Sequence, residues 1–156
     1  MRTRHQWTID STDDIHKTLR GWAEGGAPAD RYSVRFDLRG STGNPISVPN
    51  LLRGFYVVAH GPAPVYVGGD TTVQAVESAV VYTTEDGVVE AYDSATVYAY
   101  GRSEVTLDNE AAVFVASDDV LVTAYGSGTV HLPAGGFPGS AATVQLEGEA
   151  ARIIRR

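Results

Sequence analysis

Two consecutive octapeptides near the middle of the chain decide its fold: VEAYDSAT at residues 89–96 and VYAYGRSE at residues 97–104. A valine opens each copy, and the spacing of eight continues on both sides, from Phe55 to about Pro133. The first places of the copies are Val57, Val65, Val73, Val81, Val89, Val97, Val105, Val113 and Leu121. A fixed period of this kind is typical of proteins built by stacking equivalent units.

Each octapeptide reads as one short strand followed by one corner. The first and third places are apolar or small, as in Val97 and Ala99, and side chains two apart on a strand share a face. We expect these side chains to point inward. The fifth and sixth places hold turn formers such as Asp93-Ser94, and the seventh is small in most copies. The dominance of Val and Thr argues against a helical repeat.

The second, outward place shows how many octapeptides complete one coil. Every second copy carries an aromatic residue there, which gives a column with a period of sixteen: Tyr66, Tyr82, Tyr98 and Phe114. A period of three copies produces no such column. The sequence therefore predicts a mainly β protein, a flattened two-sheet β-solenoid with two octapeptides in each sixteen-residue coil. Successive coils should stack about 4.8 Å apart, the spacing of neighbouring strands in a sheet.

Sixteen-residue coils divide the outward residues between two unlike faces. One face is expected to be uncharged and to show Pro64, Tyr66, Gly68, Val80, Tyr82, Thr84, Thr96, Tyr98, Tyr100, Ala112, Phe114 and Ala116. The other is mixed and is expected to show Tyr56, Val58, His60, Thr72, Gln74, Val76, Val88, Glu90, Tyr92, Glu104, Thr106, Asp108, Val120, Val122 and Ala124. After Leu121 the register is expected to slip by one residue, to Val130.

The segment before the repeat has the features of a cap. A strand is expected at His5–Asp10, a helix at residues 11–24 and a second strand at Tyr32–Leu38. Ser11 or Thr12 can cap the helix, which carries one apolar stripe formed by Ile15, Leu19 and Trp22. Because a solenoid exposes its core at its ends, we expect this α/β cap to close the first coil; partner binding is the alternative. The predicted divisions are 1–54 (cap), 55–132 (solenoid) and 133–156 (closing strands).

Charge is distributed unevenly along the chain, whose net charge is −7. Residues 54–150 contain one Arg and thirteen Asp or Glu, whereas residues 1–53 and 151–156 are rich in Arg. An acidic body argues against binding nucleic-acid phosphates. No cysteine is present, and neither a signal peptide nor a transmembrane segment is recognised, so we expect synthesis in the cytoplasm without membrane association.

No catalytic, cofactor or metal motif emerges, and the sequence predicts a protein that is not an enzyme and needs no cofactor. His5, His16, His60 and His131 lack ligand spacing and are expected to be surface histidines. Acids recur at the corners and form an acidic edge: Asp70, Glu85, Asp86, Asp118 and Asp119. Calcium binding by these acids is an alternative to simple solvation.

The uncharged face is the predicted interface, carried by Tyr66, Tyr82, Tyr98, Tyr100 and Phe114. Aromatic, uncharged patches of this kind usually mark interaction sites. Self-association into a dimer or trimer is the leading interpretation; a different protein partner, coverage by the chain's own termini, and glycan binding are alternatives. A further alternative is inhibition of a nucleic-acid-binding host protein by acids that replace phosphates: Glu77, Glu85, Asp86, Asp93, Glu110, Asp118 and Asp119.

The copies at 89–96 and 97–104 resemble the AYxSATV-like octapeptide repeats of β-solenoid proteins encoded by actinobacterial phages and prophages. The short helix before the repeats is similar as well, and the resemblance covers roughly half of the chain. It implies a phage-linked protein, either a virion component or an early factor that acts on the host. Copies at 57–72 and 105–128 depart from the repeat consensus.

Overall fold

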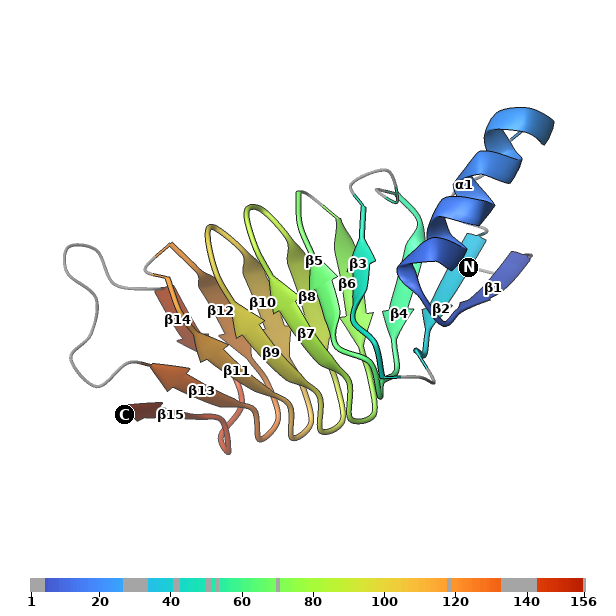
Figure 1. Cartoon of the computed structure of the whole chain (residues 1–156). Helices are drawn as coiled ribbons and strands as arrows, with labels where there is room; N and C mark the ends of the chain where they lie inside the picture. Colours follow the sequence, from blue (N-terminus) through green and yellow to red (C-terminus); the bar gives the residue numbers. More distant parts are fainter. Residues whose placement is uncertain are drawn as a thin grey trace.

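The structure, a computed structural model, describes residues 5–26, 34–40, 43–49, 52, 54–69, 71–117, 119–132 and 143–155. Here the chain winds into a β-solenoid whose strands alternate between two parallel sheets, which confirms the predicted fold class (Figure 1). Sheet A contains, in spatial order, β1 (His5–Ile9), β2 (Val34–Leu38), β4 (Tyr56–Ala59), β6 (Thr72–Ala75), β8 (Val88–Ala91), β10 (Glu104–Leu107), β12 (Leu121–Ala124) and β14 (Thr143–Leu146). Sheet B contains β3 (Ile46–Val48), β5 (Val65–Val67), β7 (Val80–Thr83), β9 (Thr96–Ala99), β11 (Ala112–Val115), β13 (Thr129–Leu132) and β15 (Arg152–Arg155).

Two strands complete one coil, and the coils stack in register. In sheet A, Val57 lies beside Val73 and Val73 beside Val89, each sixteen residues apart. The valines and alanines of the first and third octapeptide places fill the thin interior between the sheets, and almost all are fully buried. Equivalent side chains therefore pack on one another from coil to coil, which is why the sequence repeats.

The corners rely on a left-handed backbone at one position. Glu77, Glu85, Asp93 and Asn109 have φ of 53–57°, and Gly69 and Gly101 occupy the same place in other coils. Apart from glycine, which has no Cβ, only Asn and Asp adopt this conformation with any frequency, so the stacked coils must hold Glu77 and Glu85 in it. Backbone amides in the corners donate hydrogen bonds to backbone carbonyls of the preceding coil; for example, the Arg102 amide donates to the Glu85 carbonyl at 2.8 Å.

The register slip falls earlier than the sequence predicts. Five residues, 116–120, connect β11 to β12, whereas four residues, 100–103, connect β9 to β10. The extra residue moves Val122, not Leu121, beside Val105, and the partners of β10 with β12 and of β11 with β13 lie seventeen residues apart. Leu121 is 39% exposed, and the predicted inward position for it is wrong. The predicted outward positions of Val120, Val122 and Ala124 are wrong too, because all three are fully buried.

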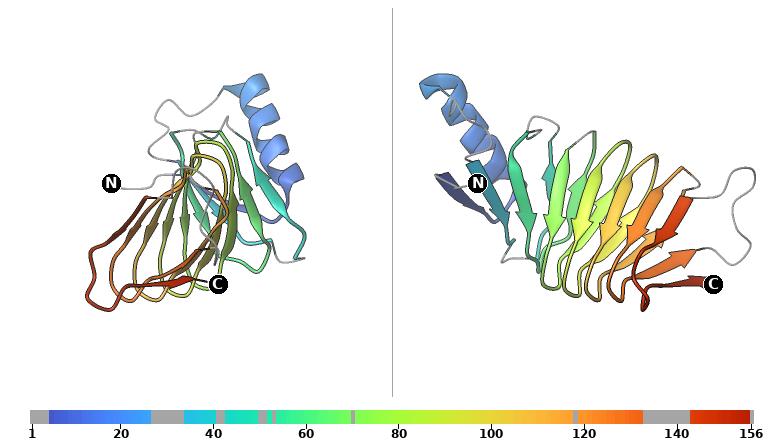
Figure 2. Two further views of the ribbon diagram at one scale, coloured as in Figure 1. Left: turned by 90° about the vertical axis from the view of Figure 1, so that its left-hand side faces the viewer. Right: turned by 180° about the vertical axis from the view of Figure 1, so that it is seen from behind.

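The amino-terminal end is covered by α1 (Thr12–Gly25), whose position is shown in Figures 1 and 2. Ser11 is its N-cap and accepts a hydrogen bond from the Asp14 amide. Ile15 is fully buried, and Leu19 and Trp22 pack against the same core. The Trp22 ring lies 5.2 Å from Phe55 and 5.8 Å from Phe36, centre to centre. The helix therefore lies over the inward side of β2, at the end where sheet A extends beyond sheet B.

The stack of coils is longer than the octapeptide segment. Before it, β2 pairs with β4 and β3 pairs with β5; after it, β14 pairs with β12 and β15 with β13. The closing strands predicted within residues 133–156 are thus β14 and β15, which form one more coil. The terminal segments share the architecture although they lack the repeat.

Candidate interaction face

Sheet B carries a continuous row of aromatic rings on its outer surface. Tyr66, Tyr82, Tyr98 and Phe114 occupy equivalent places on β5, β7, β9 and β11, and their ring centres are 4.8, 4.8 and 5.0 Å apart. Neighbouring rings are tilted by only 10–14°, so each stacks on the next. The rings thus repeat with the spacing of the strands.

His131 extends this row by a fifth ring. It follows Val130 on β13, pairs with Phe114 across the sheet, and stacks on it with ring centres 4.2 Å apart and planes tilted by 5°. The prediction that His131 is a surface histidine missed this role. The signal was present in the sequence: Val113 and Val130 lie seventeen apart, so His131 is the equivalent of Phe114 once the extra corner residue is counted.

We call the outer surface of β5, β7, β9, β11 and β13 the ladder face. Besides the five rings it presents Val80, Thr96, Ala112 and Thr129, and it contains no Lys, Arg, Asp or Glu. Tyr66 is 42% exposed, while Tyr82, Tyr98 and Phe114 are half-buried because their neighbours cover their ring faces. Tyr100 lies at the corner after β9, at the edge of this face, and is as exposed as Tyr66.

Stacking decides what the ladder face can offer to a partner. Inside the row both faces of each ring contact another ring, so ring edges and the hydroxyls of Tyr66, Tyr82 and Tyr98 point outward. Burial and the neighbouring Tyr98, Tyr66 and Tyr100 raise the pKa of Tyr82, so this phenol stays neutral over the physiological range. Sugar rings that stack on aromatic side chains need open ring faces, which the interior of the row does not supply.

The outer surface of sheet A differs, because it buries a charged cluster at its amino-terminal end. Asp37 on β2 is 1% exposed and its Oδ1 accepts hydrogen bonds from Arg35 at 2.9 Å and pairs with His60 Nε2 at 2.7 Å. Gln6 donates to the other carboxylate oxygen. Burial alone would raise the pKa of Asp37, but the hydrogen bonds from Arg35, His60 and Gln6 and the Arg35 charge outweigh it and hold the pKa below its usual value.

His60 is therefore not the surface histidine that the sequence predicts. It is 7% exposed and lies between two carboxylates, with Glu77 Oε1 3.6 Å from its Nδ1. The expected exposure failed because Asp37, its partner, comes from the cap, twenty-three residues earlier in the chain. Val58, another predicted outward residue, is 2% exposed in the same region. The cluster links the cap to the first coils.

The corner acids divide between two opposite edges of the solenoid. Glu77, Asp93 and Glu110 follow strands of sheet A, whereas Glu85, Asp86 and Asp119 follow strands of sheet B. Asp70 and Asp118 lie outside the described residues. Glu85 Oε2 accepts a hydrogen bond from the Gly69 amide, and Asp86 pairs with Arg102 at 3.1 Å. A partner that contacts one edge would meet only about half of the acids proposed as phosphate substitutes.

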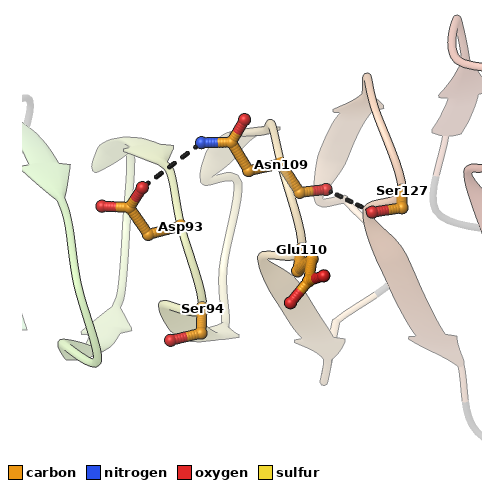
Figure 3. Close-up of a pocket in the computed structure, with 5 residues that line it drawn as sticks. All are labelled: Asp93, Ser94, Asn109, Glu110 and Ser127. Carbon is orange, nitrogen blue, oxygen red and sulfur yellow. Dashed lines mark hydrogen bonds between the residues drawn. The ribbon is translucent and has the colours of Figure 1, made fainter.

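One edge has a shallow depression of about 490 Å³, shown in Figure 3. It is lined by Asp93, Ser94, Asn109, Glu110 and Ser127. Several of its polar groups bond to one another along the stack: Asn109 donates to Asp93 at 3.4 Å, and Ser127 donates to the Asn109 carbonyl at 2.9 Å. Asp93 also accepts from the Glu77 amide at 2.9 Å. This column ties consecutive corners together.

Neither a metal cluster nor a membrane-spanning helix is found in the part of the chain that the structure describes. No group of three or more His, Cys, Asp or Glu side chains among the described residues is arranged to hold a metal ion. No helix in the same residues is long and apolar enough to cross a membrane. Comparison of the chain with protein-family models, with curated proteins and with solved structures finds no match.

Proposed function

We propose that this protein is a non-enzymatic interaction module that self-associates by packing the ladder face of one copy against the ladder face of another. The observation that carries this proposal is the row of five stacked rings on an uncharged surface. Charged residues are depleted and Tyr and Phe enriched in the cores of protein interfaces. A surface this regular and this poor in charge is unusual on an acidic body with a net charge of −7.

The spacing of the ladder favours a second copy as the partner. Ring edges and hydroxyls recur every 4.8 Å along the face. A second ladder face has the same period, so every contact made at one ring recurs at the next ring when two faces meet. A two-fold axis that lies between the two faces and parallel to them would bring each ring row against the other in an isologous, closed interface. A partner without this period would match only one or two rings.

The phage link rests on the repeat resemblance alone and belongs to this proposal. Both a virion assembly module and an early factor acting on the host would use an elongated protein that binds its partner through one face. The acidic-inhibitor alternative draws less support, because its acids lie on two opposite edges. Glycan stacking draws less support, because the ring faces inside the row are covered.

The test places a charge in the middle of the ladder face. In Tyr82→Glu/Tyr98→Glu, an interface would have to bury two unpaired carboxylates, which is costly. We expect the oligomeric mass measured by light scattering to fall relative to the parent, while the far-ultraviolet circular dichroism keeps its β-sheet signature. Thr123→Glu, on the outer surface of sheet A, is the matched control and should leave the mass unchanged.

Two outcomes would overturn the proposal. One is a variant that retains the mass of the parent at every concentration tested. The other is a glycan array on which the parent binds and the ladder variant does not, with both proteins monomeric. The latter would make the ladder face a sugar-binding site instead.

A further inference from the structure

The two ends of the solenoid differ in how their core and their edge strands are covered. At the amino-terminal end α1 covers the core, and its Thr12 side chain accepts a hydrogen bond from the Ser47 amide of β3, the edge strand of sheet B, at 3.0 Å. Such contacts block an edge from pairing with another chain. At the carboxy-terminal end, β14 and β15 are the last strands of their sheets among the described residues.

Inward side chains become exposed at this second end. Leu146 on β14 is 41% exposed and Ile153 on β15 is 38% exposed. Their equivalents one coil earlier, Ala124 and Val130, are fully buried. The described coils thus end with apolar core residues uncovered by a further coil.

Backbone groups at this end also point outward. The Glu147 amide donates to Ala124 and the Arg152 amide donates to Gly128, so both face the preceding coil. Because backbone directions alternate along a strand, Leu146 and Ile153 turn their N–H and C=O groups towards the open side. Among the described residues, no strand pairs with these backbone groups and no further coil covers the two apolar side chains.

We propose that two copies join tail to tail, with β14 of each copy pairing antiparallel with β15 of the other. A two-fold axis parallel to the strands and between the sheets produces this arrangement and makes both sheets continuous through the dimer. The chain climbs along the axis as it coils, so β15 stands further out than β14. When β14 of each copy pairs with β15 of the other, the distance between the paired strands is the same in both sheets. If β14 paired with β14 and β15 with β15, the strands of one of these two pairs would lie too far apart to form hydrogen bonds.

Charge selects the register of this pairing. When Leu146 lies opposite Ile153 of the second copy, the two residues are edge-facing and inward, as a hydrogen-bonded antiparallel pair requires. The same register places Glu147 opposite Arg152 of the second copy, and both are exposed on the outer surface. The two-fold axis creates this opposite-charge pair twice. Opposite charges directly across a strand pair stabilise it, and like charges oppose it.

A charge exchange tests the proposal, carried out in the Tyr82→Glu/Tyr98→Glu background so that the ladder face does not contribute. In this background we expect a concentration-dependent dimer. Glu147→Arg alone and Arg152→Glu alone should each shift the mass to the monomer, because each places like charges opposite one another twice. Glu104→Arg, on sheet A two strands before the end, should leave the dimer intact.

The decisive measurement is a mixture of the two single variants. In the heterodimer the substituted position 147 of one copy would face the substituted position 152 of the other, and the native Arg152 would face the native Glu147. Both pairs then unite opposite charges, so the mixture should dimerise at concentrations where neither variant does. The double variant Glu147→Arg/Arg152→Glu should dimerise by itself.

Three outcomes would each overturn the proposal. They are a background protein that stays monomeric, single variants that dimerise as well as their parent, and a mixture that does not associate. Circular dichroism on every variant separates lost association from lost folding.

Discussion

At the scale of single residues, Asp37 is the least replaceable charge that the structure describes. It is almost completely buried, yet it is ionised, because Arg35, His60 and Gln6 all direct hydrogen bonds at its two oxygens. A buried charge is stable only when its partners are in place, and removing one member leaves the others without compensation. The cluster therefore contributes mostly as a unit that fixes the cap against the first coils.

We expect Asp37→Asn to lower the free energy of unfolding at neutral pH by about 3 kcal/mol, since it removes the charge that compensates Arg35 and replaces one accepting oxygen with a donating NH2 group. The folded-state pKa of Asp37 is lowered, so its contribution is complete above the unfolded-state pKa of about 3.9 and is lost as the pH falls through the folded-state value. The difference between the two proteins should shrink below about pH 4. Urea denaturation at a series of pH values measures this.

Asp86→Asn is the matched control, because Asp86 pairs with Arg102 at the surface, where both side chains are more than half exposed. Exposed pairs contribute little, so we expect a change within about 0.5 kcal/mol. Equal effects of the two substitutions at neutral pH would contradict a structural role for the buried cluster.

At the scale of elements, strands and corners differ in how they accept a change of length. Residues 116–120 form a corner one residue longer than 100–103, yet β12 still pairs with β10 in register, with Val122 beside Val105. The corner accommodates the extra residue because, of its described residues, only Val120 enters the core, while Ala116, Ser117 and Asp119 lie outside it. A strand has no such freedom, because one residue more or less reverses the faces of all residues that follow.

Two single-residue deletions test this difference. Deleting Asp119 from the long corner should leave the β-sheet signature and the melting temperature close to those of the parent, because it restores a four-residue corner. Deleting Thr106 from β10 should abolish cooperative thermal unfolding, because Leu107 would leave the core and Asp108 would enter it. If both deletions had the same effect, the corner would not be the place where the register changes.

The same contrast explains which elements could be predicted from the sequence. The column from Val57 to Val113 and the four rings from Tyr66 to Phe114 follow from spacing alone, because stacking places equivalent residues in register. The register slip could not be located, since Val120, Leu121 and Val122 are all apolar and alternation gives no indication there. His131 was missed in consequence.

Contacts between the cap and the repeat could not be predicted from the sequence for another reason. His60 bonds to Asp37, and Trp22 packs on Phe36 and Phe55, through pairings that follow no period. β14 and β15 also lack the octapeptide pattern, and only their neighbours β12 and β13 show where they belong. The pairings within the periodic part of the fold can be predicted from the sequence, whereas the contacts that its aperiodic ends make with the coils require the structure.

At the scale of the whole molecule, a stack in which each coil contacts only its neighbours has stability that varies along its axis. The middle coils have neighbours on both sides, and the amino-terminal end has the cap. The last coil, formed by β14 and β15, has a described neighbour on one side only. Local opening should therefore begin at this end.

Hydrogen exchange measured at two protein concentrations tests this gradient. In dilute solution we expect the amides of β8 and β9 to exchange slowest and those of β14 and β15 fastest. At high concentration the amides of Leu146 and Ile153 should become protected, because the tail-to-tail pairing would use them. Protection of β14 and β15 equal to that of β8 at both concentrations would contradict the gradient.

The sixteen-residue offset between neighbouring coils has a consequence for how such a protein can evolve. Each coil whose sheet B strand lies between β5 and β13 contributes one ring to the ladder face. An in-frame duplication of one coil by recombination between repeats would lengthen the rod by one strand spacing, about 4.8 Å, and add one more ring. The number of coils would then set both the length of the solenoid and the number of rings available for binding. Both would change in discrete steps, and no new binding surface would have to evolve.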